Sequence, residues 1–268
     1  MKQKIFRTLR NCCFAWRTGA SLRDKALLAW MMCRHILANR GLLSFSNDHR
    51  CLRVRFRATS RLVCLRNNRT DIIIFQDIFQ NGCYELPELD AVHIVDAGAN
   101  IGLASLYLSI VCPKAEVCSF EPVEYEMCRR NASRVFEIAL GSRSGMLNIL
   151  IDPVNSGGHR LELYDSDPSL QRREVPIRRL DELIDEDKIA APDFLKIDAE
   201  GAECDILEGL GRHVQGVRGM VAEIQSPVNH ARMMQMIKAA GFAQVEEHVL
   251  NPSASLPGDS YSIITAKR

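Results

Sequence analysis

The stretch VDAGANIG, residues 95–102, lies between two apolar runs and decides the fold class. Residues 92–95 are typical of a short buried strand, and residues 103–111 are typical of an apolar helix. Gly98 and Gly102 allow a tight turn and let a ligand approach the backbone closely. The helix that follows offers free N–H groups and the positive end of its dipole. The segment therefore predicts a strand, a glycine loop and a helix that together bind a ligand.

Two acidic residues at strand ends favour one kind of ligand over others. Asp96 lies where the first strand ends, and a carboxylate there repels a pyrophosphate but can receive the ammonium group of a methionine moiety. Glu121 follows the next expected strand, residues 116–120. An acid at that position of a doubly wound fold accepts hydrogen bonds from the two ribose hydroxyls. The alternative is that both acids only cap or solvate the edge of the sheet.

Strands and helices alternate along the rest of the chain, which indicates an α/β fold. Residues 243–249 and 260–265 are strands with no helix between them, and they predict an antiparallel hairpin at the sheet edge. We expect a doubly wound, mostly parallel Rossmann-like sheet over residues 92–268. The other strands are expected at residues 136–140, 146–151, 194–197 and 220–224, and the other helices at 124–135, 180–186, 202–210 and 230–240.

The head of the chain has a composition of its own. Residues 1–50 hold ten Lys or Arg against two acids, although the net charge of the whole chain is only +1. We expect a basic helical N-terminal extension here, followed over residues 51–91 by lead-in strands and a helix. A row of apolar residues recurs at helical spacing in the extension: Leu22, Ala26, Leu27, Trp30 and Met31.

Three interpretations of the basic extension remain open. The first is helices that pack on the main domain or on a second subunit, so a homo-oligomer is one option. The second is an interfacial helix with its apolar side in the headgroups and its bases toward anionic lipid, a peripheral membrane contact. The third, a tail for nucleic acid, is not favoured because no stacking aromatics are interleaved with the bases.

The cysteine pattern and the hydropathy suggest a cytoplasmic protein, with a membrane-peripheral location as the alternative. Ten cysteines are scattered without a CxxC pair, which is typical of free thiols in a reducing compartment. No stretch approaches the roughly 20 apolar residues of a membrane-spanning helix. No convincing secretory signal is present.

Candidate catalytic residues should project from the carboxyl ends of the parallel strands. Asp198 follows the expected strand at residues 194–197, and alternation places Lys196 on the same side. Asp198 is the first candidate for a catalytic or acceptor-orienting carboxylate. Glu223, in the neighbouring strand, is a partner for it if its side chain faces the same pocket.

Three further side chains bear on catalysis. His159 follows Gly157 and Gly158 in a polar segment, and imidazole titrates near neutrality, so His159 is the second catalytic candidate. Glu200 and Glu203 come next to Asp198, where negative charge also suits a helix start. Asp198 with either glutamate could hold Mg²⁺ through oxygen ligands. That alternative is not favoured, and no residue is assigned as a metal ligand.

Residues from about 69 to 267 resemble the FkbM family of S-adenosylmethionine-dependent methyltransferases. The resemblance rests on four motifs in this order: VDAGANIG (95–102), SFEP (119–122), ALGSRSG (139–145) and LKIDAEGAECDILEG (195–209). It implies the class I methyltransferase fold and S-adenosylmethionine as cofactor. By position, the residues that would line the donor are Asp96, Gly98, Asn100 and Gly102 at the methionine end, Glu121 at the ribose and Ala139 beside the adenine.

The resemblance implies O-methylation of a hydroxyl on a sugar, glycan or secondary-metabolite acceptor. Two other functions are considered, namely an NAD-linked oxidoreductase and a cofactor-binding module without catalysis. The chain departs from the family pattern after Asn131, where only residues 132–138 remain to finish a helix and form a strand. This shortening leaves the assignment of Ala139 to the adenine open.

Overall fold

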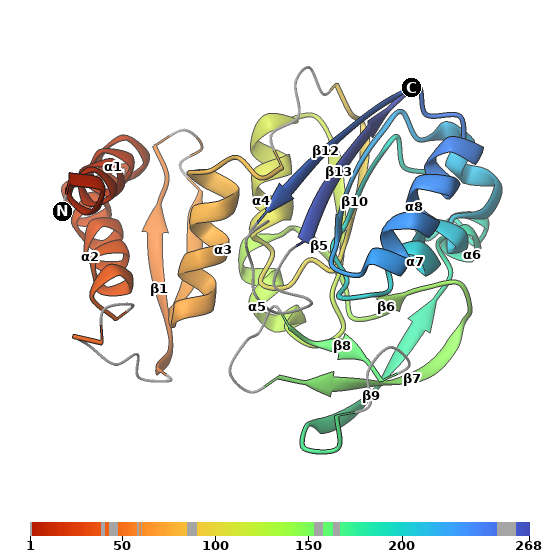
Figure 1. The fold of residues 1–268 in the computed structure, drawn as a ribbon, viewed down its shortest axis with the longest axis horizontal. Coiled ribbons are helices and arrows are strands. Elements are labelled where there is room, and N and C mark those ends of the chain that lie inside the picture. The colour runs from red at the N-terminus through yellow and green to blue at the C-terminus, as the bar shows by residue number, and fades with distance from the viewer. Residues whose placement is uncertain are drawn as a thin grey trace. The chain divides into compact units, whose positions relative to one another are not determined.

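The structure is a computed structural model that describes residues 2–38, 41–42, 48–57, 59, 61–84, 90–152, 158–162, 167–250 and 261–268. The chain forms two compact units, Met1–Glu85 and Leu86–Arg268. In Figure 1 the first unit is coloured red to orange and the second yellow to blue. The sequence-based division at residues 50 and 91 stays a prediction.

The first unit combines three helices with a two-stranded antiparallel sheet. Its elements are α1 (Lys2–Thr18), α2 (Leu22–Ala38), β1 (Asp48–Arg55), β2 (Leu62–Asn67) and α3 (Arg69–Phe79). No helix in the described part of the chain is both long and apolar enough to cross a lipid bilayer.

Local chemistry explains where these helices begin and end. At Gly19, between α1 and α2, an added Cβ would lie only 2.6 Å from the backbone nitrogen of Lys25, so the helices can turn here only because the residue is glycine. The side chain of Asn68 accepts a hydrogen bond from the Asp71 backbone N–H at 2.8 Å and thereby caps α3. This cap starts the helix ahead of residues 72–75, so their apolar run is helical.

The apolar row expected along α2 coincides only in part with the buried side of that helix. The buried residues of α2 are Asp24, Leu28, Met31, Met32 and His35. Of the expected row, Met31 is buried, whereas Leu22 is 70% exposed and Trp30 is 45% exposed. Most of this row therefore lies off the buried side of α2, and the three interpretations of the basic extension stay open.

The second unit is built on a seven-stranded sheet whose order is β12-β13-β11-β10-β3-β4-β5. Five of its strands are parallel: β3 (His93–Ala97), β4 (Glu116–Phe120), β5 (Arg134–Phe136), β10 (Phe194–Ile197) and β11 (Gly219–Ile224). The antiparallel pair is β12 (Gln244–Leu250) and β13 (Tyr261–Lys267), with β13 between β11 and β12. The predicted mostly parallel sheet with an antiparallel C-terminal hairpin is confirmed.

Helices cover both faces of this sheet, as a doubly wound fold requires. Figure 1 shows α4 (Leu103–Val111) and α5 (Tyr125–Asn131) on one face. The other face carries α6 (Leu180–Asp185), α7 (Glu203–Gly209) and α8 (Pro227–Ala239), with a short 3₁₀ helix, Gly211–Gly216, after α7.

A second sheet of four strands was not predicted from the sequence. Its order is β6-β9-β7-β8, with bounds β6 (Ala139–Leu140), β7 (Gly145–Ile151), β8 (Arg160–Leu161) and β9 (Gln171–Arg178). The single strand expected at residues 136–140 is in fact divided, because β5 ends in the first sheet and β6 begins in the second. The preceding helix, α5, ends at Asn131 rather than at residue 135.

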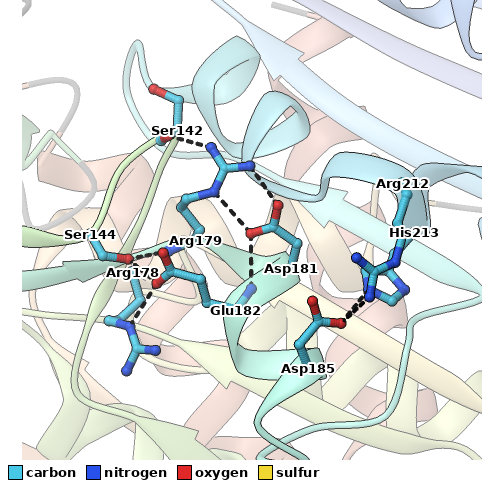
Figure 2. Close-up of polar contacts among 9 residues, drawn as sticks. All are labelled: Ser142, Ser144, Arg178, Arg179, Asp181, Glu182, Asp185, Arg212 and His213. Atoms are coloured by element: carbon cyan, nitrogen blue, oxygen red, sulfur yellow. Dashed lines mark hydrogen bonds and ion pairs between the residues drawn. The ribbon is translucent and has the colours of Figure 1, made fainter.

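Arg179 joins the second sheet to α6 (Figure 2). Its guanidinium donates to both carboxylate oxygens of Asp181, at 2.9 and 2.5 Å, and to the backbone carbonyl of Ser142 at 2.5 Å. The ALGSRSG motif also packs against α7, since a Cβ on Gly209 would lie 2.0 Å from the carbonyl oxygen of Gly141. Part of the ALGSRSG motif, whose first residue was assigned to the adenine, therefore has a structural role.

Candidate functional site

Asp96 is a wholly buried carboxylate at the carboxyl end of β3. Its Oδ1 lies 2.9 Å from the ammonium nitrogen of Lys196, and its Oδ2 accepts a hydrogen bond from Ser105 at 2.5 Å. Ser105 in turn lies 2.7 Å from the hydroxyl of Ser119 on β4. The charge of Asp96 is thus already compensated inside the protein.

Lys196 is the cation at the centre of the site. It lies directly across from Asp96 in the register of β10 and β3, and its side chain is 2% exposed. Its Nζ also donates to the carbonyl oxygen of Gly98 at 2.8 Å and lies 3.7 Å from Oδ2 of Asp198. Burial acts to lower the pKa of Lys196, but the carboxylates of Asp96 and Asp198 outweigh it and raise that pKa above its ordinary value.

The glycine loop lies tightly against the end of β10. Gly98 has φ +74°, and a Cβ there would come within 1.8 Å of the carbonyl oxygen of Asp198. Asn100 also has a positive φ of 48°. Its Oδ1 is buried and has no hydrogen-bond partner among the described residues. Such an atom is costly unless a ligand or a water donates to it.

Glu121 is held by the backbone of the same loop and of the segment after β4. Its Oε2 accepts the N–H of Asn100 at 2.8 Å, and its Oε1 accepts those of Val123 and Glu124 at 2.8 and 2.9 Å. Burial raises the pKa of Glu121, and the three N–H groups oppose that effect. The carboxylate is therefore fixed beside the glycine loop.

Asp198 follows β10, and its side chain remains 28% exposed beside Lys196. The predicted placement of Lys196 and Asp198 on one side is confirmed by their 3.7 Å separation. Two glutamates are electrostatically coupled to it. Burial and the charge of Asp198 raise the pKa of Glu200 to about 8 and that of Glu223 to about 9.

Glu203 has the structural role that its position at the start of a helix allows. It is 1% exposed, its Oε1 accepts the N–H of Gly201 at 2.6 Å, and its Oε2 lies 3.3 Å from the side-chain amide of Asn229. Asn229 also donates to the carbonyl oxygen of Gly201 at 2.9 Å. These contacts fix the turn between Asp198 and α7. Across the described ranges, no group of three or more His, Cys, Asp or Glu side chains is arranged to hold a metal ion.

His159 lies on the Glu121 side of the site. Its Nε2 is 3.6 Å from Oε1 of Glu124, and its Nδ1 accepts the backbone N–H of Asp152 at 3.0 Å. When this imidazole is protonated, it acts to lower the pKa of Glu121. Both ring nitrogens of His159 therefore have a partner. A partner of Asp198 is Lys196. Gly158 is buried, and Gly157 lies outside the described residues.

Ala139 is 8% exposed and starts β6, where it pairs with Ile177 of β9. It comes three residues after β5 and belongs to the hydrophobic core of the second unit. Its assignment to the adenine stays a prediction.

The sequence did not assign roles to Lys196, Ser105 or Ser119, although the structure connects all three to Asp96. Lys196 had a usable signal, because it interrupts the otherwise apolar strand FLKI. A lysine in a buried strand needs a carboxylate partner. Ser105 and Ser119 carry no such signal, since a serine in a helix or a strand is common without any special contact.

Comparisons with known proteins identify the family to which the chain belongs. The family described as methyltransferase FkbM domain matches residues 96–243. Methyltransferase sdnD of Sordaria araneosa is 28% identical, with 73% of this chain and 89% of that protein covered. The 31-O-demethyl-FK506 methyltransferase FkbM of Streptomyces tacrolimicus is 30% identical, with 65% and 82% covered. The crystal structure of methyltransferase FkbM from Methylobacillus flagellatus shares 15% identity, with 98% and 60% covered and a TM-score of 0.48.

Proposed function

Because the chain belongs to the methyltransferase FkbM domain family and is therefore a methyltransferase, we propose that it methylates a hydroxyl group with S-adenosylmethionine as donor. The acceptor we propose is a sugar, a glycan or a secondary metabolite. One relative is named for 31-O-demethyl-FK506, a substrate whose name places the missing methyl group on an oxygen.

The buried, unpartnered Oδ1 of Asn100 is the observation that carries the donor assignment. Asn100 belongs to a loop in which a Cβ on Gly98 would have no room. The same residue contacts Glu121, the acid proposed to bind the ribose, because its backbone N–H donates to the Glu121 carboxylate. A donor with an ammonium group and a ribose would supply hydrogen bonds to both. In this proposal Asn100, Gly98 and Gly102 hold the methionine end, Glu121 holds the ribose and Ala139 flanks the adenine.

Asp96 contributes to this site through Lys196. Because Asp96 is wholly buried and ion-paired, it fixes Lys196, and Lys196 fixes the Gly98 carbonyl. The ammonium group of the donor would then bind to a loop whose position Asp96 determines, rather than to the Asp96 carboxylate itself.

The donor, when bound, supplies an activated methyl group, so the protein has only to position the acceptor and receive its proton. Asp198 is the carboxylate that we propose orients the acceptor hydroxyl, because it is partly exposed next to the glycine loop. His159 is the second candidate for the base. To take a proton, it would have to release the Asp152 N–H from Nδ1, the ring nitrogen that accepts this hydrogen bond.

Thermal shift with S-adenosylhomocysteine and with NADH tests the donor. We expect stabilisation by S-adenosylhomocysteine, and we expect Glu121→Gln to abolish it while the exposed control Glu162→Gln keeps it. Stabilisation by NADH alone would overturn the proposal in favour of an oxidoreductase.

A screen of cell extracts with isotopically labelled donor tests the transfer. We expect Asp198→Asn to keep S-adenosylhomocysteine binding and to lose at least about a hundredfold of the transfer rate. His159→Gln separates the two candidate bases, because only the true base changes the pH profile. Binding without transfer to any acceptor, together with an inert Asp198→Asn, would indicate a non-catalytic module.

A further inference from the structure

The first unit carries an apolar row along α2 that is exposed at three of its five positions and half-buried at the other two. Along α2, the residues at i, i+4, i+8, i+11 and i+15 form one row opposite the buried side: Leu22, Ala26, Trp30, Cys33 and Leu37. Trp16 of α1, 59% exposed, lies next to it, because Lys25 of α2 stands over its ring at 4.2 Å. We call this row together with Trp16 the tryptophan face. It contains both tryptophans of the chain.

The segment that carries the tryptophan face has exposed charge of one sign among its described residues. The bases described between residues 10 and 42 are Arg10, Arg17, Arg23, Lys25 and Arg34. The single acid in that range, Asp24, is buried and accepts hydrogen bonds from Ser21 at 2.6 Å and from the Arg55 backbone at 3.1 Å. The negative charge of Asp24 is therefore buried, and the described charges exposed on this segment are basic.

The bases lie beside the aromatic rings. Lys25 covers Trp16, and the guanidinium of Arg34 lies 5.0 Å from the ring of Trp30. On the helix, Arg23 and Arg34 lie along one edge of the apolar row and Lys25 along the other. Tryptophan rings with lysine or arginine at the same level are typical of the headgroup region of a membrane, and aliphatic residues between them enter the acyl boundary.

We propose that the tryptophan face binds an anionic lipid surface, with α2 lying in the plane of the interface. Leu22 and Leu37 enter the acyl boundary, the two tryptophans lie at the headgroups, and the bases contact lipid phosphates. The proposal does not depend on the proposed function, because it rests only on residues of the first unit.

Two other partners fit this face less well. A second copy related by a twofold axis would bring the same bases against each other, and such like-charge contacts are unfavourable. A single-stranded nucleic acid needs aromatic rings that stack with successive bases. Here aliphatic residues separate the tryptophans, and a cation already covers each ring.

Tryptophan fluorescence of the full chain reports on this face specifically. We expect a blue shift, and quenching by brominated acyl chains, with vesicles of phosphatidylcholine mixed with phosphatidylglycerol. We expect neither with phosphatidylcholine alone, and we expect the binding to weaken as salt is added. Equal binding to both kinds of vesicle, or no binding to either, would overturn the proposal.

Matched variants separate charge from apolar contact. Arg17→Gln and Arg23→Gln change exposed bases, so folding is kept, and each should weaken partition about fivefold. Arg143→Gln and Lys238→Gln, on exposed positions of the second unit, should have no effect.

Leu22→Ser should weaken binding, whereas Val228→Ser, at a 77% exposed helix start in the second unit, should not. Three outcomes would each refute a lipid surface. They are equal effects of the first-unit and second-unit variants, concentration-dependent dimers of the free protein, and tighter binding to oligoribonucleotides than to vesicles.

Discussion

At the scale of single residues, Gly98 combines two constraints that can be separated. Its φ of +74° disfavours any side chain, and a Cβ would also meet the Asp198 carbonyl at 1.8 Å. Gly41 has nearly the same φ, +69°, with nothing within 4 Å of a Cβ. We expect Gly41→Ala to cost about 1 kcal/mol in free energy of unfolding and to leave S-adenosylhomocysteine binding unchanged. Gly98→Ala should cost clearly more and abolish binding, as urea unfolding and calorimetry would measure. Equal costs would show that the close approach is unimportant.

Loss of Lys196 leaves a wholly buried charge, that of Asp96, uncompensated. Lys196→Met keeps the volume but leaves Asp96 without its cation, so we expect a loss of about 3–5 kcal/mol in free energy of unfolding. The folded pKa of Lys196 is raised, so its contribution is present throughout the neutral range and is lost only as the pH rises through that value. Lys188→Met, on an exposed loop, is the control and should be near neutral. A stable Lys196→Met variant that still binds S-adenosylhomocysteine would contradict the positioning role.

Glu200 makes stability depend on pH in the opposite direction from an ordinary ion-paired acid. Because its folded pKa is raised to about 8, the folded protein binds this proton more tightly than the unfolded chain. The stability that this proton contributes is fully present below the ordinary pKa of a glutamate, and it is lost as the pH rises through about 8. We expect the free energy of unfolding to fall over this interval by up to about 1.4 kcal/mol per pH unit. Glu200→Gln should flatten the decline in urea titrations, and Glu162→Gln, whose pKa is lowered by Arg172, should not.

At the scale of elements, the junction in Figure 2 predicts a difference between two arginines. Arg179 binds Asp181 with two hydrogen bonds and the Ser142 carbonyl with a third, so Arg179→Gln should cost about 1–2 kcal/mol. Arg212 is 73% exposed and pairs only through its end with Asp185, so Arg212→Gln should cost less than about 0.5 kcal/mol. Urea denaturation of both variants checks this. A similar loss in both would mean that the junction is not what holds α6.

The elements also show what the sequence could and could not predict. The parallel core was predictable because strands such as residues 194–197 are short apolar runs bounded by polar loops. The strand β9 was missed, because only Val175 and Ile177 are buried in it and its other residues are charged or exposed. Asp96 was found, but its pairing with Lys196 depends on the register between two strands about 100 residues apart. Periodicity within one strand carries no information about such a register.

At the scale of the whole molecule, the two units should respond differently to the donor. The first unit has a core of its own around Phe14, Phe56, Phe75 and Phe79, and it holds both tryptophans. The proposed donor residues all lie in the second unit. We expect calorimetry to resolve two transitions, of which S-adenosylhomocysteine at a hundredfold excess over its Kd stabilises one by about 2.7 kcal/mol.

Tryptophan fluorescence should follow only the other transition and should not move with ligand. One transition that shifts as a whole would show that the two units unfold together.

The position of β13 has a consequence for synthesis on the ribosome. β12 is made before β13, yet it joins the sheet only through β13, which pairs with β11 on its other side. Until residues 261–267 have left the exit tunnel, the edge of β11 is open and β12 has no place in the sheet. A nascent chain stalled before these residues would therefore present an unpaired strand edge. Such an edge is a site of aggregation and a reason for chaperones to bind.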